Sequence, residues 1–140
     1  MSKVKDVMTT NLTTCKSSDD LASLAKQMRD EDVGFVPIAE GDKYVGVVTD
    51  RDIVVKGLAK GSAGEIKASD VMTEKIITGY PDMEVEEAAR LMQEHQIKRL
   101  LIVESDKIKG VITLGDIGYQ GIDEAAAGIV REVSKGNGNN

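Results

Sequence analysis

KDVMT (Lys5–Thr9) and SDVMT (Ser69–Thr73) are two versions of one short sequence, and their methionines, Met8 and Met72, stand 64 residues apart. Shifting the chain by this interval extends the match without a gap. The identical pairs include Ala25 with Ala89, Met28 with Met92, Glu40 with Glu104, Asp42-Lys43 with Asp106-Lys107, Gly46-Val47 with Gly110-Val111, Thr49 with Thr113 and Asp52-Ile53 with Asp116-Ile117. Such a long register indicates one supersecondary unit that is used twice.

Each copy opens with a short β-type run and an amphipathic helix. The runs are Leu12–Thr14 and Ile76–Thr78. In the helix that follows, apolar residues recur at i, i+3, i+4 and i+7, a spacing that places them on one face. They are Leu21, Leu24, Ala25 and Met28 in the first copy, and Val85, Ala88, Ala89 and Met92 in the second. Asp20 and Glu84 stand at the helix starts, where a carboxylate favours the helix dipole.

Two strands and a second helix complete each copy. The strands are predicted at Val33–Ala39 and Tyr44–Thr49, and in the second copy at Ile97–Val103 and Ile108–Thr113. Gly41-Asp42 and Ser105-Asp106 form the turns between them. The second helix runs from Asp50 to about Ala59 in one copy and from about Leu114 onward in the other. The predicted order is therefore β-α-β-β-α, twice.

The two copies are expected to form one module. A unit of this size is marginal alone, so we expect the copies to pack sheet to sheet with pseudo-two-fold symmetry, in an α/β (α+β) fold. Residues 1–60 are assigned to the first repeat and residues 65–128 to the second. The connection Lys56–Lys67 contains several glycines, and the Gly/Asn tail 136–140 is expected to be disordered.

Composition excludes several classes of function. The formal net charge of −6 disfavours a phosphate-backbone surface, so we expect no nucleic-acid partner. No stretch is apolar enough to span a bilayer, and the N-terminus has no apolar signal region. Cys15, the only cysteine, cannot form an internal disulfide, which fits a reducing compartment. We therefore expect a soluble cytoplasmic protein with no membrane contact.

The repeat and its local motifs resemble the CBS (cystathionine-β-synthase) domain family, over roughly Lys3 to Gly118. The motifs are the DVMT sequence near each start, Gly34–Ile38 and Lys98–Ile102 in the middle strands, and GVVTDRD (Gly46–Asp52) and GVITLGD (Gly110–Asp116). A pair of such copies is similar to a stand-alone Bateman module. Leu101 replaces a proline that is common in this family, so the second copy departs from the pattern there.

The resemblance implies two ligand sites between the copies, each completed by the opposite copy. Similar modules bind AMP, ADP, ATP or S-adenosylmethionine, with Thr and Asp of the G-x-x-T-x-x-D motif on the ribose and nearby basic residues on phosphate. Carried onto this sequence, the ligand-binding residues are Thr13, Thr14, Val36, Pro37, Thr49, Arg51, Asp52, Ile77, Thr78, Lys98, Arg99, Leu101, Thr113 and Asp116.

The Thr-x-x-Asp motif has a second interpretation. An ionised Asp accepts hydrogen bonds at two oxygens, which suits two adjacent ribose hydroxyls. The same spacing before an apolar helix is also that of a capping box with Asp in place of Glu. The two interpretations are compatible for Thr49 and Thr113.

The basic residues differ between the copies. Lys98 and Arg99 stand where the first copy has Gly34 and Phe35, and Arg51 stands where the second has Gly115. If Arg51 reaches across to join Lys98, the Asp116 site carries two cations, while the Asp52 site relies mainly on Arg99. We therefore expect it to bind phosphorylated nucleotides more tightly than the Asp52 site does. Arg51 has the alternative role of a solvated helix residue, and only one of Lys98 and Arg99 is expected to face a site.

Catalysis and metal binding lack support in the sequence. His95 is the only histidine and has no cysteine or histidine cluster around it, and no nucleophile–base pair is apparent. We therefore expect no catalysis and no cofactor, and the resemblance implies a regulatory module whose ligand is an adenosine nucleotide. Its output is expected in another, unidentified polypeptide or in self-association. The alternative is a structural or dimerisation module with vestigial sites.

The resemblance implies a homodimer, because similar modules pair through their helices, and two-fold dimers are the commonest soluble oligomers. The helices that follow Thr49 and Thr113 are expected to supply the apolar contact. The candidate contact residues are Ile53, Val54, Ile117 and Ile122.

Overall fold

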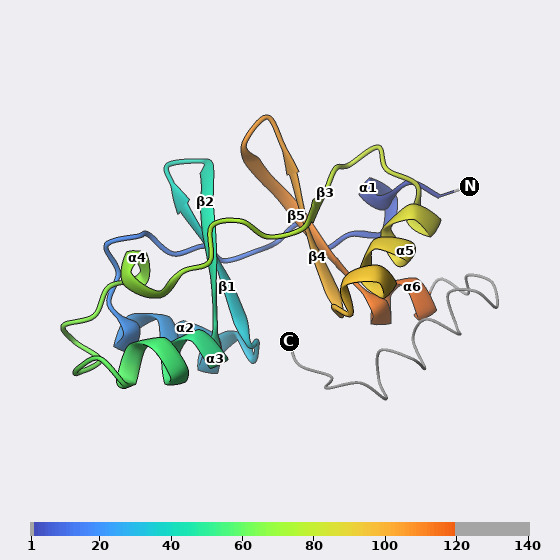
Figure 1. The fold of residues 1–140 in the computed structure, drawn as a ribbon. Coiled ribbons are helices and arrows are strands. Elements are labelled where there is room, and N and C mark those ends of the chain that lie inside the picture. The colour runs from blue at the N-terminus through green and yellow to red at the C-terminus, as the bar shows by residue number, and fades with distance from the viewer. Residues whose placement is uncertain (1, 120–140) are drawn as a thin grey trace. The chain divides into compact units, whose positions relative to one another are not determined.

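The computed structural model describes residues 2–119, which divide into two compact units (Figure 1). Residues 13–76 form one unit, called here the Asp52 unit. Residues 2–12 and 77–119 form the other, the Asp116 unit. These units do not coincide with the sequence repeats, because each DVMT-containing segment belongs to the unit that the other repeat builds. The predicted tail at 136–140 and Ile122 lie outside the described residues.

The Asp52 unit contains a two-stranded hairpin and its helices. In chain order it comprises α2 (Leu21–Glu31), β1 (Phe35–Glu40), β2 (Lys43–Thr49), α3 (Asp50–Asp52), the π-helix η1 (Ile53–Leu58) and α4 (Ala68–Val71). Strands β1 and β2 pair antiparallel, with a register shift between Ile38 and Ala39. The second predicted helix of this copy is therefore real, but most of it is wound as a π-helix.

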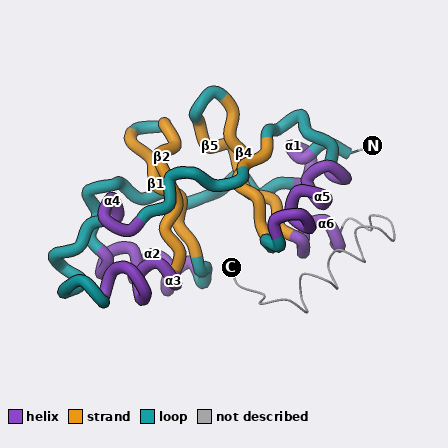
Figure 2. The backbone as a smooth tube through the Cα atoms, viewed as in Figure 1, coloured by secondary structure: helices purple, strands orange, loops and turns teal. Residues whose placement is uncertain are grey.

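The Asp116 unit repeats this arrangement with one more strand. It comprises α1 (Val4–Val7), β3 (Thr78–Gly79), α5 (Val85–His95), β4 (Arg99–Glu104), β5 (Lys107–Thr113) and α6 (Leu114–Tyr119). Strands β4 and β5 form an antiparallel hairpin whose register shifts between Ile102 and Val103, the equivalent place to that in β1. Strand β3 pairs parallel with β4. Figure 2 shows both hairpins in orange with purple helices. The mixed α+β class is thus confirmed, while the predicted sheet-to-sheet packing of the copies stays a prediction.

The predicted opening strands are shorter than expected. In the first copy Thr13 and Thr14 are not in a strand, and the run is reduced to one parallel bridge between Cys15 and Ile38. In the second copy only Thr78 and Gly79 form a strand. The middle strands also begin at Phe35 and Arg99 rather than two residues earlier, because α2 and α5 are each closed by a left-handed C-cap, Asp32 and Gln96, and two more residues separate this cap from the strand.

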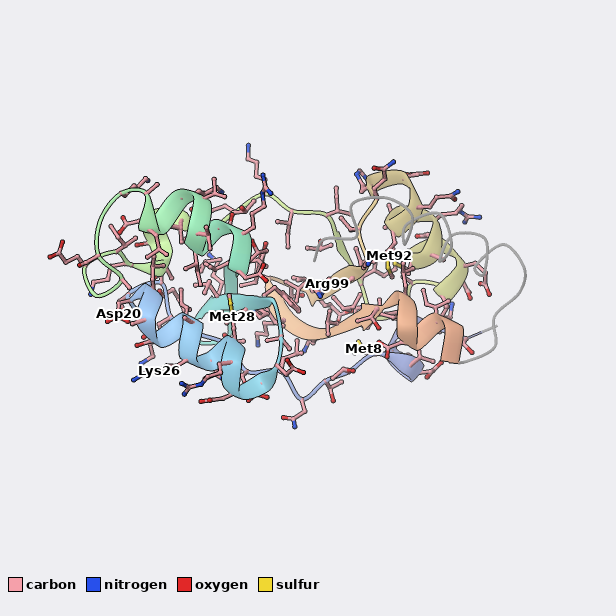
Figure 3. The ribbon with its side chains drawn as sticks, turned by 90° about the horizontal axis from the view of Figure 1, so that it is seen from below. Met8, Asp20, Lys26, Met28, Met92 and Arg99 are labelled. Carbon is pink, nitrogen blue, oxygen red and sulfur yellow. The ribbon has the colours of Figure 1, made fainter. Side chains whose placement is uncertain are left out.

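Helices α2 and α5 start at the predicted acidic residues but by different means. Asp20, labelled in Figure 3, accepts a hydrogen bond from the Ser23 backbone N–H at 2.8 Å, which lowers the pKa of its carboxyl. The Glu84 side chain caps nothing at its helix and instead pairs with Lys3 at 2.8 Å. A single sequence position thus serves as a helix cap in one unit and as an ion-pair partner in the other.

The two cores follow the predicted helical stripes with one exception. Leu21, Leu24 and Met28 are buried in the Asp52 unit. Val85, Ala88, Ala89 and Met92 are buried in the Asp116 unit. Met28 on α2 and Met92 on α5 are labelled in Figure 3. Ala25 was predicted to join the first stripe and this prediction is wrong, since Ala25 is exposed.

Ile53 and Ile117 also belong to these cores, with exposed fractions of 8% and 0%. They were predicted as dimer contacts, and that prediction is wrong because side chains already packed inside a monomer offer no surface to a partner. Val54, the third candidate, is 60% exposed.

The DVMT-containing segments Val4–Thr9 and Ala68–Thr73, called here the DVMT segments, dock against a glycine of the neighbouring hairpin. Thr9 exchanges two backbone hydrogen bonds with Val111, and Thr73 exchanges two with Val47. A Cβ atom added to Gly110 would lie 2.6 Å from the Thr9 carbonyl oxygen, and one added to Gly46 would lie 3.1 Å from that of Thr73. The two glycines are therefore needed for the approach of the chain's own backbone.

Candidate ligand-binding site

Thr49 and Asp52 lie at the junction of β2 and α3 and hydrogen-bond to each other. The Asp52 backbone N–H donates to Thr49 Oγ1 at 3.1 Å, and the Thr49 N–H donates to Asp52 Oδ2 at 3.0 Å. Asp52 is 8% exposed. The arrangement is a reciprocal capping box, in which two polar side chains satisfy two backbone donors at a helix start.

Thr113 and Asp116 repeat this geometry between β5 and α6. The Asp116 N–H donates to Thr113 Oγ1 at 3.1 Å, and the Thr113 N–H donates to Asp116 Oδ2 at 2.9 Å. Asp116 is half-buried. The capping interpretation of the Thr-x-x-Asp motif is therefore confirmed in both units. The capping box uses Oδ2 of each carboxylate and leaves Oδ1 outside it.

Lys56 is the partner that sequence reasoning missed. Its Nζ lies 3.1 Å from Asp52 Oδ1, the carboxylate oxygen that the capping box does not use, and 3.4 Å from Thr73 Oγ1. The Lys56 side chain is 46% exposed and that of Asp52 is 11% exposed. The spacing of four residues on a predicted helix was the signal that could have found this ion pair.

The other candidates of the first copy lie near this corner in the Asp52 unit. Phe35, at the start of β1, is in register with Thr49, and Val36 and Pro37 follow it as buried residues. The Cys15 N–H donates to the Pro37 carbonyl at 3.1 Å, which brings Thr13 and Thr14 beside the strand. Both threonines are exposed, and Thr13 Oγ1 donates to Glu31 at 3.1 Å. Arg51 is exposed on α3.

The candidates of the second copy gather around β4 in the Asp116 unit. Arg99, labelled in Figure 3, begins β4 in register with Thr113. Thr78 is in register with Leu101, which is 3% exposed. The Lys98 carbonyl accepts the Leu114 N–H at 3.0 Å, so this half-buried lysine lies next to the Thr113–Asp116 corner. Ile77 is 38% exposed. Leu101 is buried as Pro37 is, although the residue types differ.

Other reactive groups in the described chain do not form a site. Burial raises the pKa of the Cys15 thiol, which disfavours the reactive thiolate. In residues 2–119 there is no group of three or more His, Cys, Asp or Glu side chains that could hold a metal ion. No helix in this part of the chain has both the length and the apolar character to cross a membrane.

These observations define a class of protein: a tandem α+β repeat in which each unit carries a Thr-x-x-Asp corner at the end of a hairpin. The family model described as CBS domain matches residues 4–57 and 68–117. The chain therefore belongs to the CBS domain family.

Three similar proteins illustrate the relationship. The CBS domain-containing protein YhcV of Bacillus subtilis is 37% identical over 91% of this chain and 91% of its own. Hypoxic Response Protein I, solved with two coordinated zinc ions, has a TM-score of 0.77 and 30% identity over 86% of this chain and 99% of its own. CBSX2, solved in complex with AMP, has a TM-score of 0.76 and 26% identity over 86% of this chain and 96% of its own.

Proposed function

We propose that this chain is a regulatory module that binds an adenosine nucleotide (AMP, ADP, ATP or S-adenosylmethionine) and catalyses no reaction. One observation carries the proposal: both hairpins end in a carboxylate that a threonine backbone N–H holds in place. This carboxylate is Asp52, which is buried, in one unit and Asp116, which is half-buried, in the other. A carboxylate that is already fixed is suited to accept hydrogen bonds from the two hydroxyls of a ribose, because less side-chain entropy is lost when the ligand binds. The AMP complex of the similar protein CBSX2 supports the choice of ligand.

The mechanism that we propose is a shift of population. A nucleotide favours whichever arrangement of the molecule it binds more tightly, and a partner protein or a second copy of the chain reads that change. The ligand can bias the equilibrium only by its difference in affinity for the two states. We also propose a cytoplasmic location, for which the free thiol of Cys15 is the support.

A homodimer is part of the proposal. Val54, Val55 and Leu58 on η1 are 60%, 54% and 53% exposed, an apolar surface that a second copy would cover. Light scattering at high micromolar concentration should give a dimer mass, and Val54→Glu should shift it towards monomer. A purely monomeric wild-type protein would contradict the dimer, without affecting the proposal on nucleotides.

Calorimetric titration with the four ligands tests the central proposal. We expect at least one of them to bind the wild-type protein. The matched control is the double variant Asp52→Asn and Asp116→Asn, which keeps an oxygen to cap each helix but removes the negative charge, and should bind much more weakly. If no ligand binds at millimolar concentration, the scaffold alternative replaces the sensor.

A further inference from the structure

The Asp52 carboxylate is already engaged at both oxygens. Oδ2 accepts the Thr49 N–H at 3.0 Å, and Oδ1 lies 3.1 Å from Lys56 Nζ. Only 11% of the side chain is exposed, so the accessible part of the carboxylate is small. A hydroxyl that approaches Oδ1 meets the lysine ammonium, which is itself the stronger, charge-assisted donor.

Lys56 is held from a second direction as well. Its Nζ lies 3.4 Å from Thr73 Oγ1, and Thr73 belongs to the DVMT segment that pairs with Val47 of β2. The ammonium therefore bridges the helix that carries Asp52 and the segment docked on the hairpin. These groups all belong to the Asp52 unit.

The second copy differs at this position. The residue that corresponds to Lys56 is Gln120, which lies outside the described residues. A glutamine carries no charge, so it cannot form the same ion pair with Asp116. The two carboxylates share their capping geometry, but the sequence supplies a competing cation at this position only in the first copy.

We propose that Lys56 is an internal competitor for the ribose at Asp52 and lowers the affinity of this site for nucleosides. The inference rests on the proposed function and concerns how the same site is regulated. A ribose diol binds Asp52 only after the ammonium leaves Oδ1. The free energy of the broken ion pair then makes binding less favourable by the same amount. The residue thereby sets a difference in affinity between the Asp52 and Asp116 sites.

Adenosine is the appropriate probe because it has a ribose but no phosphate, so attraction between Lys56 and a phosphate does not enter. The measurement is made in an Asp116→Asn background, which keeps a cap acceptor and weakens the other site. In this background, Lys56→Gln should bind adenosine about two- to fivefold more tightly than the chain that retains Lys56, the range expected for a partly exposed ion pair. Lys60→Gln, which removes an exposed lysine of the same region, is the control and should change nothing.

Salt dependence gives a second readout. Salt screens the Lys56–Asp52 attraction, so adenosine affinity should rise between low and high salt when Lys56 is present and stay flat in Lys56→Gln. Thermal unfolding of each variant confirms that it is folded.

Equal adenosine affinities for Lys56→Gln and for the chain that retains Lys56 would show that Lys56 is not a competitor. The proposal of a nucleotide site at Asp52 would not be affected. Weaker binding by Lys56→Gln would also overturn it, by making Lys56 a ligand contact. If neither wild type nor variant binds adenosine at millimolar concentration, this inference fails. The proposed function fails with it only if AMP, ADP, ATP and S-adenosylmethionine also do not bind the wild-type protein.

Discussion

The two units hold their DVMT segments with the same backbone hydrogen bonds but with different side chains. The Val4 N–H donates to the Met83 carbonyl and the Ala68 N–H to the Asp19 carbonyl, both at 2.8 Å. In the Asp116 unit two ion pairs add to this, each at 2.8 Å: Lys5 of the segment with Asp82, and Lys3, the residue just before the segment, with Glu84. In the Asp52 unit the positions of Lys5 and Asp82 are occupied by serines, Ser69 and Ser18.

The comparison shows that the units keep the backbone docking geometry while the side chains around it differ. The docking geometry is shared by the units because a glycine in each hairpin admits the segment, whatever the flanking side chains are. The charges vary only in part. The positions of Lys3 and Glu84 stay charged as Lys67 and Asp20, whereas the Lys5–Asp82 pair is found in one unit alone and the Lys56–Asp52 pair at the ligand corner of the other.

The largest expected effect comes from exchanging core residues between the units. Leu24 and Ala88 occupy equivalent positions and both are 0% exposed. Leu24→Ala gives the Asp52 unit the residue of its counterpart but leaves a cavity, so its free energy of unfolding should fall by about 2–5 kcal/mol. Ala88→Leu should overpack the Asp116 unit at a cost of about 1–3 kcal/mol. Denaturant unfolding measures both. Small changes in both variants would mean that the two cores are interchangeable.

Removing the motif carboxylates compares the two corners directly. Asp52→Ala and Asp116→Ala should each lower nucleotide affinity at their own site about ten- to a hundredfold, the value of a hydrogen bond to a charged group. Each should also lower the free energy of unfolding by about 0.5–1.5 kcal/mol, because the backbone N–H of the threonine loses its hydrogen-bond acceptor. The stability loss should be larger for Asp52, because this carboxylate is buried and Lys56 loses its partner.

Calorimetry and thermal unfolding of the same variants separate these effects. Loss of stability with unchanged nucleotide affinity would leave the corners as helix caps alone. The Asp→Asn variants, which keep a cap acceptor, should retain most of the stability while losing affinity.

The smallest expected effect is the pH dependence of the Lys5–Asp82 pair, whose side chains are 52% and 63% exposed. The hydrogen bond and charge of Lys5 lower the pKa of Asp82 from its usual 3.8. The pair therefore contributes stability above that pH, and the contribution is lost as the pH falls through the lowered pKa. Asp82 in turn raises the pKa of Lys5, so stability is also lost at alkaline pH as the pH rises through that raised value.

Lys5→Ser introduces the residue of the other copy. It should make the protein slightly less stable at pH values between the two pKa values, and should not change the stability at pH values below the lowered pKa of Asp82. Thermal unfolding from acid to neutral pH measures the difference. The reverse exchange, Ser18→Asp with Ser69→Lys, should build the same pair into the Asp52 unit. A stability difference between Lys5→Ser and wild type that is independent of pH would exclude the ion pair as its cause.

Much of each unit is predictable because it depends on neighbours in the chain. The helical stripes and the Thr-x-x-Asp spacing are local patterns, and they lead to the correct helices and caps although Ala25 is exposed. The 64-residue repeat extends these elements from one copy to the other. The Asp52–Lys56 pair was within reach of the same reasoning, because the two residues are four positions apart in a predicted helix. It was missed because the Asp was considered only as a ligand contact or a cap.

Ala25 and Ala89 mark the limit of this reasoning. They are the same residue at the same place in the repeat, yet Ala25 is exposed and Ala89 is 3% exposed. No local pattern could separate them, because burial depends on what other elements cover the helix. The same limit applies to the dimer candidates, since Ile53 and Ile117 look like surface-forming apolar residues in the sequence and are core residues in the structure.

The repeat, the family resemblance, the order of the main helices and strands, and the residues of the two corners follow from the sequence alone. Which DVMT segment belongs to which hairpin is known only from the fold. As judged from local sequence, the backbone N–H groups of Val4 and Ala68 could bond to either copy. Each copy has an equivalent carbonyl acceptor, Asp19 or Met83, and a glycine in its hairpin that admits the segment. The choice is made by long-range pairing, in which Thr9 joins Val111 and Thr73 joins Val47, and such pairing leaves no signature in the residues on either side.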